Sequence, residues 1–303
     1  MKKTLWEERG YERDMVKSHP VRQVRDFYEV IAETRKLVDR HLAESAYYSN
    51  HWRMELQYVA ASIGPTEDMK ILDIGCGPAH ILSELDLLPN SEYVGLDLAR
   101  NALPGVRDLP QAGFLVGNAE ALPFASHTFD TVFASHVVEH LHNPDAFTSE
   151  CFRVLKPKGK FIVATPVKSS LFKKPMLMKF ASLIGATISF CLSIPKPRTF
   201  MTGILDLASS RTPFEETTKA FSQEEHVHEF ELEELKEALE SKGFRVMQVR
   251  LSGLHVFFYS LTLNNLFGSM WYRITSSIEK WQSENLRRFA LDMTITAQKH
   301  RPS

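Results

Sequence analysis

The chain has 303 residues, of which 44% are hydrophobic and 24% charged, and its formal net charge is −1. This composition is typical of a globular protein with one large domain or two small ones, and it excludes the overall basic surface of a general nucleic-acid-binding protein. The two lysines near the N-terminus precede no apolar core, so we expect no secretory signal. Cys76, Cys151 and Cys191 form no C-x-x-C pair, which favours a reducing cytoplasm.

The first predicted elements are helices. Apolar residues recur at three- and four-residue steps over residues 21–38 and again over 52–63, and Gly64 and Pro65 end the second helix. We interpret residues 1–66 as an N-terminal helical lid.

After residue 66 the hydrophobic pattern changes. Short apolar runs alternate with helical or loop segments, which indicates strands buried on both faces of a parallel sheet. The runs are Ile71–Ile74, Tyr93–Leu96, Phe114–Val116, Thr131–Ala134 and Phe161–Ala164. Helices are predicted at Pro78–Leu88 and Pro144–Leu155, the second with Asn143 as its N-cap and an end near Pro157. We assign residues 67–165 to a ligand-binding core with a doubly wound α/β sheet.

Residues 166–229 are expected to form a helical cap inserted into this core. Within them lies an uncharged apolar stretch, residues 180–194. As a helix it would extend only about 22 Å, too short for a bilayer core of about 30 Å. The favoured reading is a buried cap helix. The alternative is peripheral contact with a membrane through residues 173–198, which include flanking lysines and an arginine.

The sheet pattern resumes in residues 230–303. An amphipathic helix with an acidic first turn is predicted over 230–243, and Gly243 closes it. Strands are predicted over 244–251 and 290–298, with a helical stretch over 266–288 between them.

Ligands of a doubly wound sheet bind beyond the carboxyl ends of its strands. The first strand here ends in a turn that contains Gly75, Cys76 and Gly77. His80 stands where a dinucleotide fingerprint favours a small residue, and no Lys-Ser or Lys-Thr follows as a phosphate-binding P-loop requires. The glycines still allow close approach of a ligand, and the helix expected to follow them offers N–H groups to a carboxylate.

The next two strands indicate the rest of the ligand. Asp97 follows Asp73 at close to the roughly 20-residue offset at which a carboxylate meets ribose hydroxyls, and Leu98 could pack against a base. After the third strand, Asn118 and Glu120 can hydrogen-bond an adenine edge beside Ala119. The inferred ligand has a carboxylate end, a ribose and a base, with no phosphate required.

At this point the sequence resembles the class I S-adenosylmethionine-dependent methyltransferases, over residues 68–165 and more weakly from 226 onward. Four motifs in the family's order carry the resemblance: "ILDIGCGPA", "VGLDLA", "GNAEALPFASHTFDTVFASHVVEHL" and "RVLKPKGKFIVATP". The resemblance implies a seven-stranded sheet with its last strand antiparallel, and S-adenosyl-L-methionine as cosubstrate. It also implies roles for individual residues: Asp73, Gly75 and Gly77 on the methionine side, Asp97 at the ribose, Asn118 and Ala119 at the adenine, and Ser135 and His136 near the methyl group.

Histidines are the candidate catalytic residues, because imidazole titrates near neutrality and an oxygen or nitrogen acceptor must lose a proton. We place His136 first, followed by His140 and His228. The stretch "HVVEH" (136–140) also matches a zinc-hydrolase pattern, but that pattern needs a helix and His136 is predicted at a strand tip, so we expect no metal site. Cys76 is interpreted as a packed residue, since no base is placed beside it.

The acceptor is sought in the variable segments. Residues 254–272, with the cap and the N-terminal helices, would form an apolar, aromatic roof, which favours a hydrophobic small molecule or lipid-like acceptor methylated on O, N or C. Few basic residues accompany the aromatics, so a nucleic-acid acceptor is not expected. A non-methylating binding module of the same fold is the alternative function. The oligomeric state and the acceptor's identity are left open.

Overall fold

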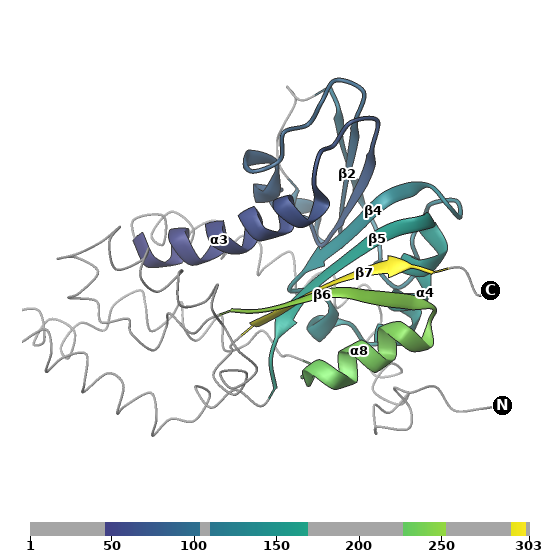
Figure 1. The fold of residues 1–303 in the computed structure, drawn as a ribbon. Helices are drawn as coiled ribbons and strands as arrows, with labels where there is room; N and C mark the ends of the chain where they lie inside the picture. Colours follow the sequence, from purple (N-terminus) through teal and green to yellow (C-terminus); the bar gives the residue numbers. More distant parts are fainter. Residues whose placement is uncertain (1–45, 104–109, 169–226, 253–291, 301–303) are drawn as a thin grey trace, which may run out of the picture.

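A seven-stranded sheet forms the centre of the molecule. The computed structural model describes residues 46–103, 110–168, 227–252 and 292–300. Within these ranges the strand order is β3-β2-β1-β4-β5-β7-β6 (Figure 1). The strands are β1 (Lys70–Ile74), β2 (Glu92–Asp97), β3 (Ala112–Val116), β4 (Phe129–Ser135), β5 (Leu155–Pro166), β6 (Phe244–Ser252) and β7 (Asp292–Lys299). Strands β1 to β5 pair in parallel and β7 is antiparallel to both neighbours, so the predicted sheet is confirmed.

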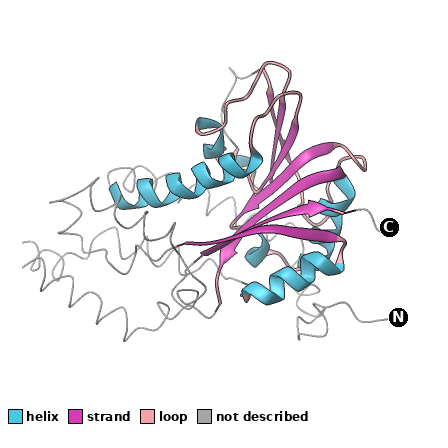
Figure 2. Cartoon of the chain, in the orientation of Figure 1, coloured by secondary structure: helices cyan, strands magenta, loops and turns pink. Residues whose placement is uncertain are grey.

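Helices cover both faces of the sheet (Figure 2). On one face, α3 (Ala46–Ile63) packs Val59 and Ile63 against Ile71, Tyr93 and Phe133. The other face carries α4 (Pro144–Val154) and α8 (Leu232–Ser241), which share a core with alternate residues of the same strands. Burial on both faces explains why these strands read as continuous apolar runs.

The C-terminal end of α3 is fixed to the sheet. Gly64, at φ +83°, ends the helix, and the Lys160 ammonium donates to the carbonyls of Ser62 (3.1 Å) and Ile63 (3.0 Å). A cation at this position satisfies carbonyl groups that lack partners within the helix. The helix therefore ends beside Lys160 of β5, and its earlier turn with Glu55 lies at Ser135, the carboxyl end of β4.

Two further helices were anticipated from their capping residues. Asn143 Oδ1 accepts from the Ala146 N–H at 2.9 Å and begins α4. Helix α8 begins with a reciprocal capping box between Glu231 and Glu234, and Gly243 follows its end at φ +93°. The run from Leu155 through Gly159 does not simply end α4 but already belongs to β5.

The prediction of a helix over Pro78–Leu88 is wrong. Only a short 3-10 turn, η2 (His80–Ser83), forms there, after Ala79 in a left-handed conformation at φ +57°. Thr66 explains why the helix stops, because its hydroxyl donates to the Asp86 carbonyl and accepts from the Leu88 N–H at 3.2 Å. The remaining 3-10 turns are η3 (Arg100–Ala102) and η4 (Val138–His140).

Several predictions fall outside the described residues. They are the helix over 21–38, the apolar stretch 180–194, the segment 254–272 and the helix over 266–288. The division into 1–66, 67–165, 166–229 and 230–303 stays a prediction. None of the helices in the described ranges has the length and apolar character needed to cross a bilayer.

Candidate active site

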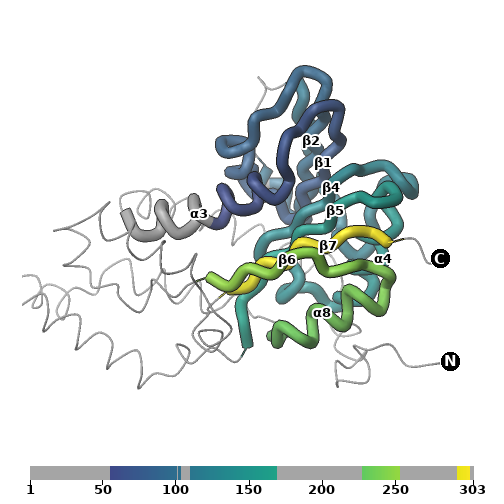
Figure 3. The backbone as a smooth tube through the Cα atoms, viewed as in Figure 1, coloured from purple at the N-terminus to yellow at the C-terminus, as the bar shows by residue number. Residues whose placement is uncertain are grey.

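The strand order reverses between β1 and β4. From β1 the chain builds outward through β2 and β3, and it then returns to place β4 on the other side of β1, as the path of the tube shows (Figure 3). In open α/β sheets, ligands bind at such a reversal, outside the carboxyl ends of the strands. The turns that follow β1, β2, β3 and β4 are therefore the candidate site.

The glycine turn after β1 packs directly against the chain that leaves β4. Gly75 has φ +70°, and a Cβ at this position would overlap Val137 Cγ2. Gly77 also has a positive φ, +48°, but a Cβ there would meet nothing within 4 Å. Gly75 thus allows two chain segments to touch, while Gly77 presents its backbone to open space where a ligand can approach.

Cys76 lies between these glycines and is buried. Its sulfur sits where a Cβ on Gly95 would point, so it fills space between β1 and β2. Burial raises the pKa of the Cys76 thiol, and the charges of Asp73 and Asp97 raise it further. A thiol in this state is a packing residue and not a nucleophile.

Asp97 joins the ends of β1 and β2. Its Oδ2 accepts from the Gly77 N–H and its Oδ1 from the Ala99 N–H, both at 2.9 Å. These bonds fix the orientation of a half-buried carboxylate beside the open backbone of Gly77. Leu98, half-buried, follows directly. The position suits a group that brings hydroxyl donors, as a ribose does.

Asp73 points toward the face of the sheet that α3 covers. Its side chain is buried, accepts a hydrogen bond from the Tyr93 hydroxyl, and lies near Asp97. Burial raises the pKa of Asp73 to about 8, against the lowering effect of Tyr93 and with the help of the Asp97 charge. A positively charged ligand group near Asp73 would favour its ionised form.

The loop after β3 carries Asn118, Ala119 and Glu120. Asn118 Oδ1 accepts from the Glu120 N–H at 2.9 Å, and Ala119 is buried in the core. Glu120 Oε1 accepts from the Asn143 N–H at 2.8 Å, so this carboxylate ties the loop to the start of α4. Of the residues expected at an adenine edge, Glu120 is thus already engaged in holding the loop.

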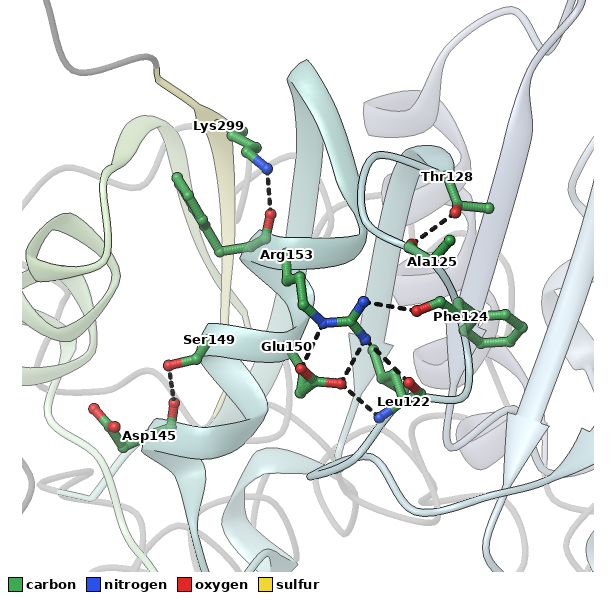
Figure 4. Close-up of polar contacts among 10 residues, drawn as sticks. Leu122, Phe124, Ala125, Thr128, Asp145, Ser149, Glu150, Arg153 and Lys299 are labelled. Carbon is green, nitrogen blue, oxygen red and sulfur yellow. Dashed lines mark hydrogen bonds and ion pairs between the residues drawn. The ribbon is translucent and has the colours of Figure 1, made fainter.

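An ion pair on α4 holds the same loop further along (Figure 4). Arg153 donates to the carbonyls of Phe124 (2.6 Å) and Leu122 (3.0 Å), and Glu150 Oε2 accepts from the Leu122 N–H at 2.8 Å. Arg153 and Glu150 also bond each other, which lowers the pKa of Glu150. Sequence reasoning missed both residues, although their three-residue spacing on a predicted helix was a visible signal.

The tip of β4 carries a second group of polar residues. Ser135 donates to Glu55 Oε1 at 2.5 Å, and His136 Nε2 lies 3.3 Å from Glu55 Oε2. His136 Nδ1 lies 3.2 Å from Glu139 Oε1, and Glu139 Oε2 accepts from the Thr165 hydroxyl at 3.1 Å. Glu55 and Glu139 are 6% and 1% exposed, so each carboxylate depends on these partners.

His136 is unusual in both charge and backbone. Burial, the largest influence, would lower its pKa, but Glu55 and Glu139 together raise the pKa well above the ordinary value. Its backbone is left-handed at φ +53°, a costly conformation for a residue other than glycine. Glu55 and Glu139 therefore favour the charged form of the imidazole at the tip of β4, one residue from the Val137 that Gly75 contacts.

His140 and His228 lie around Glu139. His140 is the last residue of η4. Burial would raise the pKa of Glu139, but His136 and, to a lesser extent, His140 lower it below the ordinary value. The His228 N–H donates to the Glu139 carbonyl at 3.0 Å, and burial lowers the pKa of its imidazole. The three predicted catalytic histidines are thus brought to one neighbourhood.

The stretch "HVVEH" does not form the helix that a zinc-hydrolase motif needs. His136 directly follows β4, which ends at Ser135, and residues 138–140 form only a 3-10 turn. Among the described residues, no three His, Cys, Asp or Glu side chains are arranged to hold a metal ion.

Sequence reasoning also missed Glu55. The signal was one carboxylate on the apolar face of the predicted helix 52–63, a turn before Val59. Its meaning could not be read from the helix alone, because its partners Ser135 and His136 lie far away in sequence.

The strand order, with β7 antiparallel, is that of the class I S-adenosylmethionine-dependent methyltransferase fold. The profile of the family described as "Methyltransferase domain" matches residues 72–163, which run from β1 into β5. The core of the chain is therefore similar to this family.

Curated relatives match part of the chain. A ubiquinone biosynthesis O-methyltransferase of Cereibacter sphaeroides is 37% identical over 106 residues, 33% of this chain and 42% of the relative. A sterol 24-C-methyltransferase of Neurospora crassa is 32% identical over 129 residues, 40% of this chain and 34% of the relative. A demethylmenaquinone methyltransferase of Renibacterium salmoninarum is 32% identical over 117 residues, 38% of this chain and 48% of the relative. The matches therefore span less than half of these relatives.

Among solved structures, the chain is similar to one from the complex of the Haloferax volcanii Trm112 methyltransferase activator with a methyltransferase. The TM-score is 0.51 at 16% identity, covering 92% of this chain and 99% of that chain. At this identity the similarity shows the fold alone.

Proposed function

We propose that this protein is an S-adenosylmethionine-dependent methyltransferase that acts on a hydrophobic small-molecule or lipid-like acceptor, at an O, N or C atom. One observation carries the cosubstrate assignment. Asp97 is held by the N–H groups of Gly77 and Ala99 at the strand-order reversal, with Gly77 open to a ligand.

The residues present fit the cosubstrate. Asp97 would accept from the ribose hydroxyls beside Leu98, and Asn118 and Ala119 would meet the adenine. The methionine part of the cosubstrate would be lined by Asp73, Gly75, Cys76 and Gly77. The ionised carboxylate of Asp73 would balance the positive charge of this part of the cosubstrate. Bound S-adenosylmethionine supplies a methyl group that its sulfonium already activates. The protein then mainly has to hold donor and acceptor in line and exclude water.

An O- or N-acceptor must also lose a proton. His136 lies between two carboxylates that favour its charged form, and a charged imidazole cannot accept a proton. His228 has a lowered pKa and is therefore neutral near pH 7. This supports His228 over His136 as proton acceptor, with His140 beside the same glutamate as the further candidate.

Relatives and sequence support the acceptor class. The named relatives act in ubiquinone biosynthesis or on sterols and demethylmenaquinone. The chain has two long apolar segments of its own, residues 180–194 and 254–272. A bulky apolar acceptor fits both observations. Contact with a membrane surface through residues 173–198 is a linked proposal, and pelleting with liposomes tests it, since recovery in the supernatant contradicts it.

Two measurements test the function. Calorimetric titration with S-adenosylhomocysteine should show binding to the wild type. Mass spectrometry of a cell lipid extract incubated with the protein and isotopically labelled S-adenosylmethionine should show a new labelled product. Absence of binding contradicts the cosubstrate assignment. Binding without any labelled product supports a non-methylating module instead.

A further inference from the structure

Glu55 is a buried carboxylate on α3 that the core motifs do not account for. It lies on the same face of α3 as Val59 and Ile63, which follow about one and two helical turns later and pack onto the sheet. Its own side chain is 6% exposed. Burying a carboxylate costs several kcal/mol unless hydrogen-bond donors or cations compensate its charge. Its carboxylate accepts a hydrogen bond from the Ser135 hydroxyl and lies against the His136 imidazole.

The geometry around His136 sets its protonation. Its two ring nitrogens lie 3.3 Å from a Glu55 oxygen and 3.2 Å from a Glu139 oxygen. A neutral imidazole carries one N–H and can donate to only one carboxylate, whereas the charged form donates to both. Among the described residues, Glu55 from α3 and Glu139 from η4 are charged groups that face the ring, and His140 acts on Glu139 in turn.

We propose that Glu55 is a positioning residue of the methyl-transfer site, which holds Ser135 and His136 in one arrangement at the tip of β4. The inference rests on the proposed function. One contact connects this tip with the cosubstrate side, because Val137 follows His136 and touches Gly75. The Ser135 hydroxyl donates to Glu55, so Glu55 also sets the orientation of this hydroxyl.

Glu55 also ties the N-terminal helix to the site. It lies outside residues 72–163, the region that matches the family profile. Lys160 fixes the C-terminal end of α3 and Glu55 fixes its middle, so the helix is held at two points along the sheet. The arrangement of the β4 tip therefore depends on a helix that lies outside the region matched by the family profile.

The first test measures His136 directly. NMR titration of the histidine rings in the full chain, with His136 assigned from the spectrum of His136→Gln, should give a raised pKa in the wild type. Glu55→Gln should lower the His136 pKa by at least about one unit, a tenfold loss of proton affinity. The matched control is Glu92→Gln, which removes an exposed carboxylate paired with Lys70 and should leave His136 unchanged. An unchanged His136 pKa in Glu55→Gln overturns the proposal.

A second variant keeps the test possible if Glu55→Gln does not fold stably. Where Glu55→Gln melts too low for titration, Glu55→Asp keeps the charge with a shorter reach and should lower the His136 pKa by less. No change in Glu55→Asp then overturns the proposal. These titrations need neither cosubstrate nor acceptor, so their failure is separate from failure of the proposed function, which S-adenosylhomocysteine binding reports.

The functional readout is the pH profile of methyl transfer to the labelled product. The wild-type profile should show no inflection from His136 near neutrality, and Glu55→Gln should introduce one. A lower but equally shaped profile in Glu55→Gln would mean that Glu55 only supports the fold, and it overturns the positioning role.

Discussion

The two sides of the site are built in different ways. On the cosubstrate side, Asp97 is held by backbone N–H groups within a few residues of the strand ends. On the β4 side, His136 is held by side chains from α3 and η4, which the fold brings together. The first kind of site depends on local turns, and the second depends on the docking of a distant helix. Substitutions should therefore act on them separately.

The largest expected effect concerns the pH dependence of stability on the cosubstrate side. The pKa of Asp73 is about 8 in the fold, above its ordinary value of 3.8. Protonated Asp73 therefore stabilises the fold fully below about pH 4, and this contribution is lost as the pH rises through 8. The wild-type free energy of unfolding should fall by up to about 1.4 kcal/mol per pH unit between these values.

Asp73→Asn should remove this slope in urea unfolding measured from about pH 5 to about pH 8, because the amide does not titrate. Saturating S-adenosylhomocysteine should flatten the wild-type slope as well, since its ammonium favours the ionised carboxylate. The exposed Asp86→Asn should keep the wild-type slope. Parallel slopes for Asp73→Asn and the wild type would contradict the assignment.

The next largest effect is at the contact between the two sides. Gly75→Ala introduces a methyl group that overlaps Val137 and forces alanine into φ +70°. We expect a loss of about 3 kcal/mol in the free energy of unfolding, from overpacking and from the left-handed backbone. Denaturant unfolding measures it.

Gly113→Ala is the matched control, because a Cβ there meets nothing within 4 Å, and it should change stability little. Adding Val137→Ala to Gly75→Ala should recover the overpacking part and leave the backbone cost. If the double variant is no more stable than Gly75→Ala, the two turns do not touch as described.

A smaller effect is expected from Asp97 on cosubstrate affinity. Asp97→Asn keeps the size of the side chain but turns one of the two acceptor oxygens that meet Gly77 and Ala99 into a donor. S-adenosylhomocysteine should bind about 30- to 100-fold more weakly, about 2–3 kcal/mol, by the usual value of hydrogen bonds to a charged group. Calorimetric titration gives the affinity, and Asp68→Asn, an exposed aspartate, should bind as the wild type does. The His136 pKa should not change, because Asp97 does not contact the β4 tip group.

The sequence predicted the local parts of this molecule well. The strands of the core and the caps of α4 follow from buried apolar runs and from Asn143, whose signals lie within a few residues. The helix after Gly77 was predicted wrongly, because Thr66, a residue of the preceding connection, holds Asp86 and Leu88 in another conformation.

On the site, the sequence indicated the residues at the strand ends but not what holds them. The roles proposed for Asp73, Asp97, Asn118 and the three histidines stay predictions. The sequence could not reveal that His136 meets Glu55, because that contact depends on how α3 docks, and no periodicity encodes the partner of a buried charge.

The smallest expected effect tests whether the loop after β3, like Asp97, is part of the cosubstrate side of the site. Arg153 uses its guanidinium to reach two carbonyls and Glu150 at once, which a lysine ammonium cannot do with the same geometry. Arg153→Lys should lower the free energy of unfolding by about 1 kcal/mol, a modest value because the side chain is one-third exposed. S-adenosylhomocysteine should bind a few-fold more weakly, since the loop that carries Asn118 and Ala119 is less well fixed.

Arg245→Lys, on the exposed face of β6, is the matched control and should change neither quantity. Full affinity in Arg153→Lys, together with the loss of stability, would mean that the ion pair on α4 supports the fold without shaping the adenine loop.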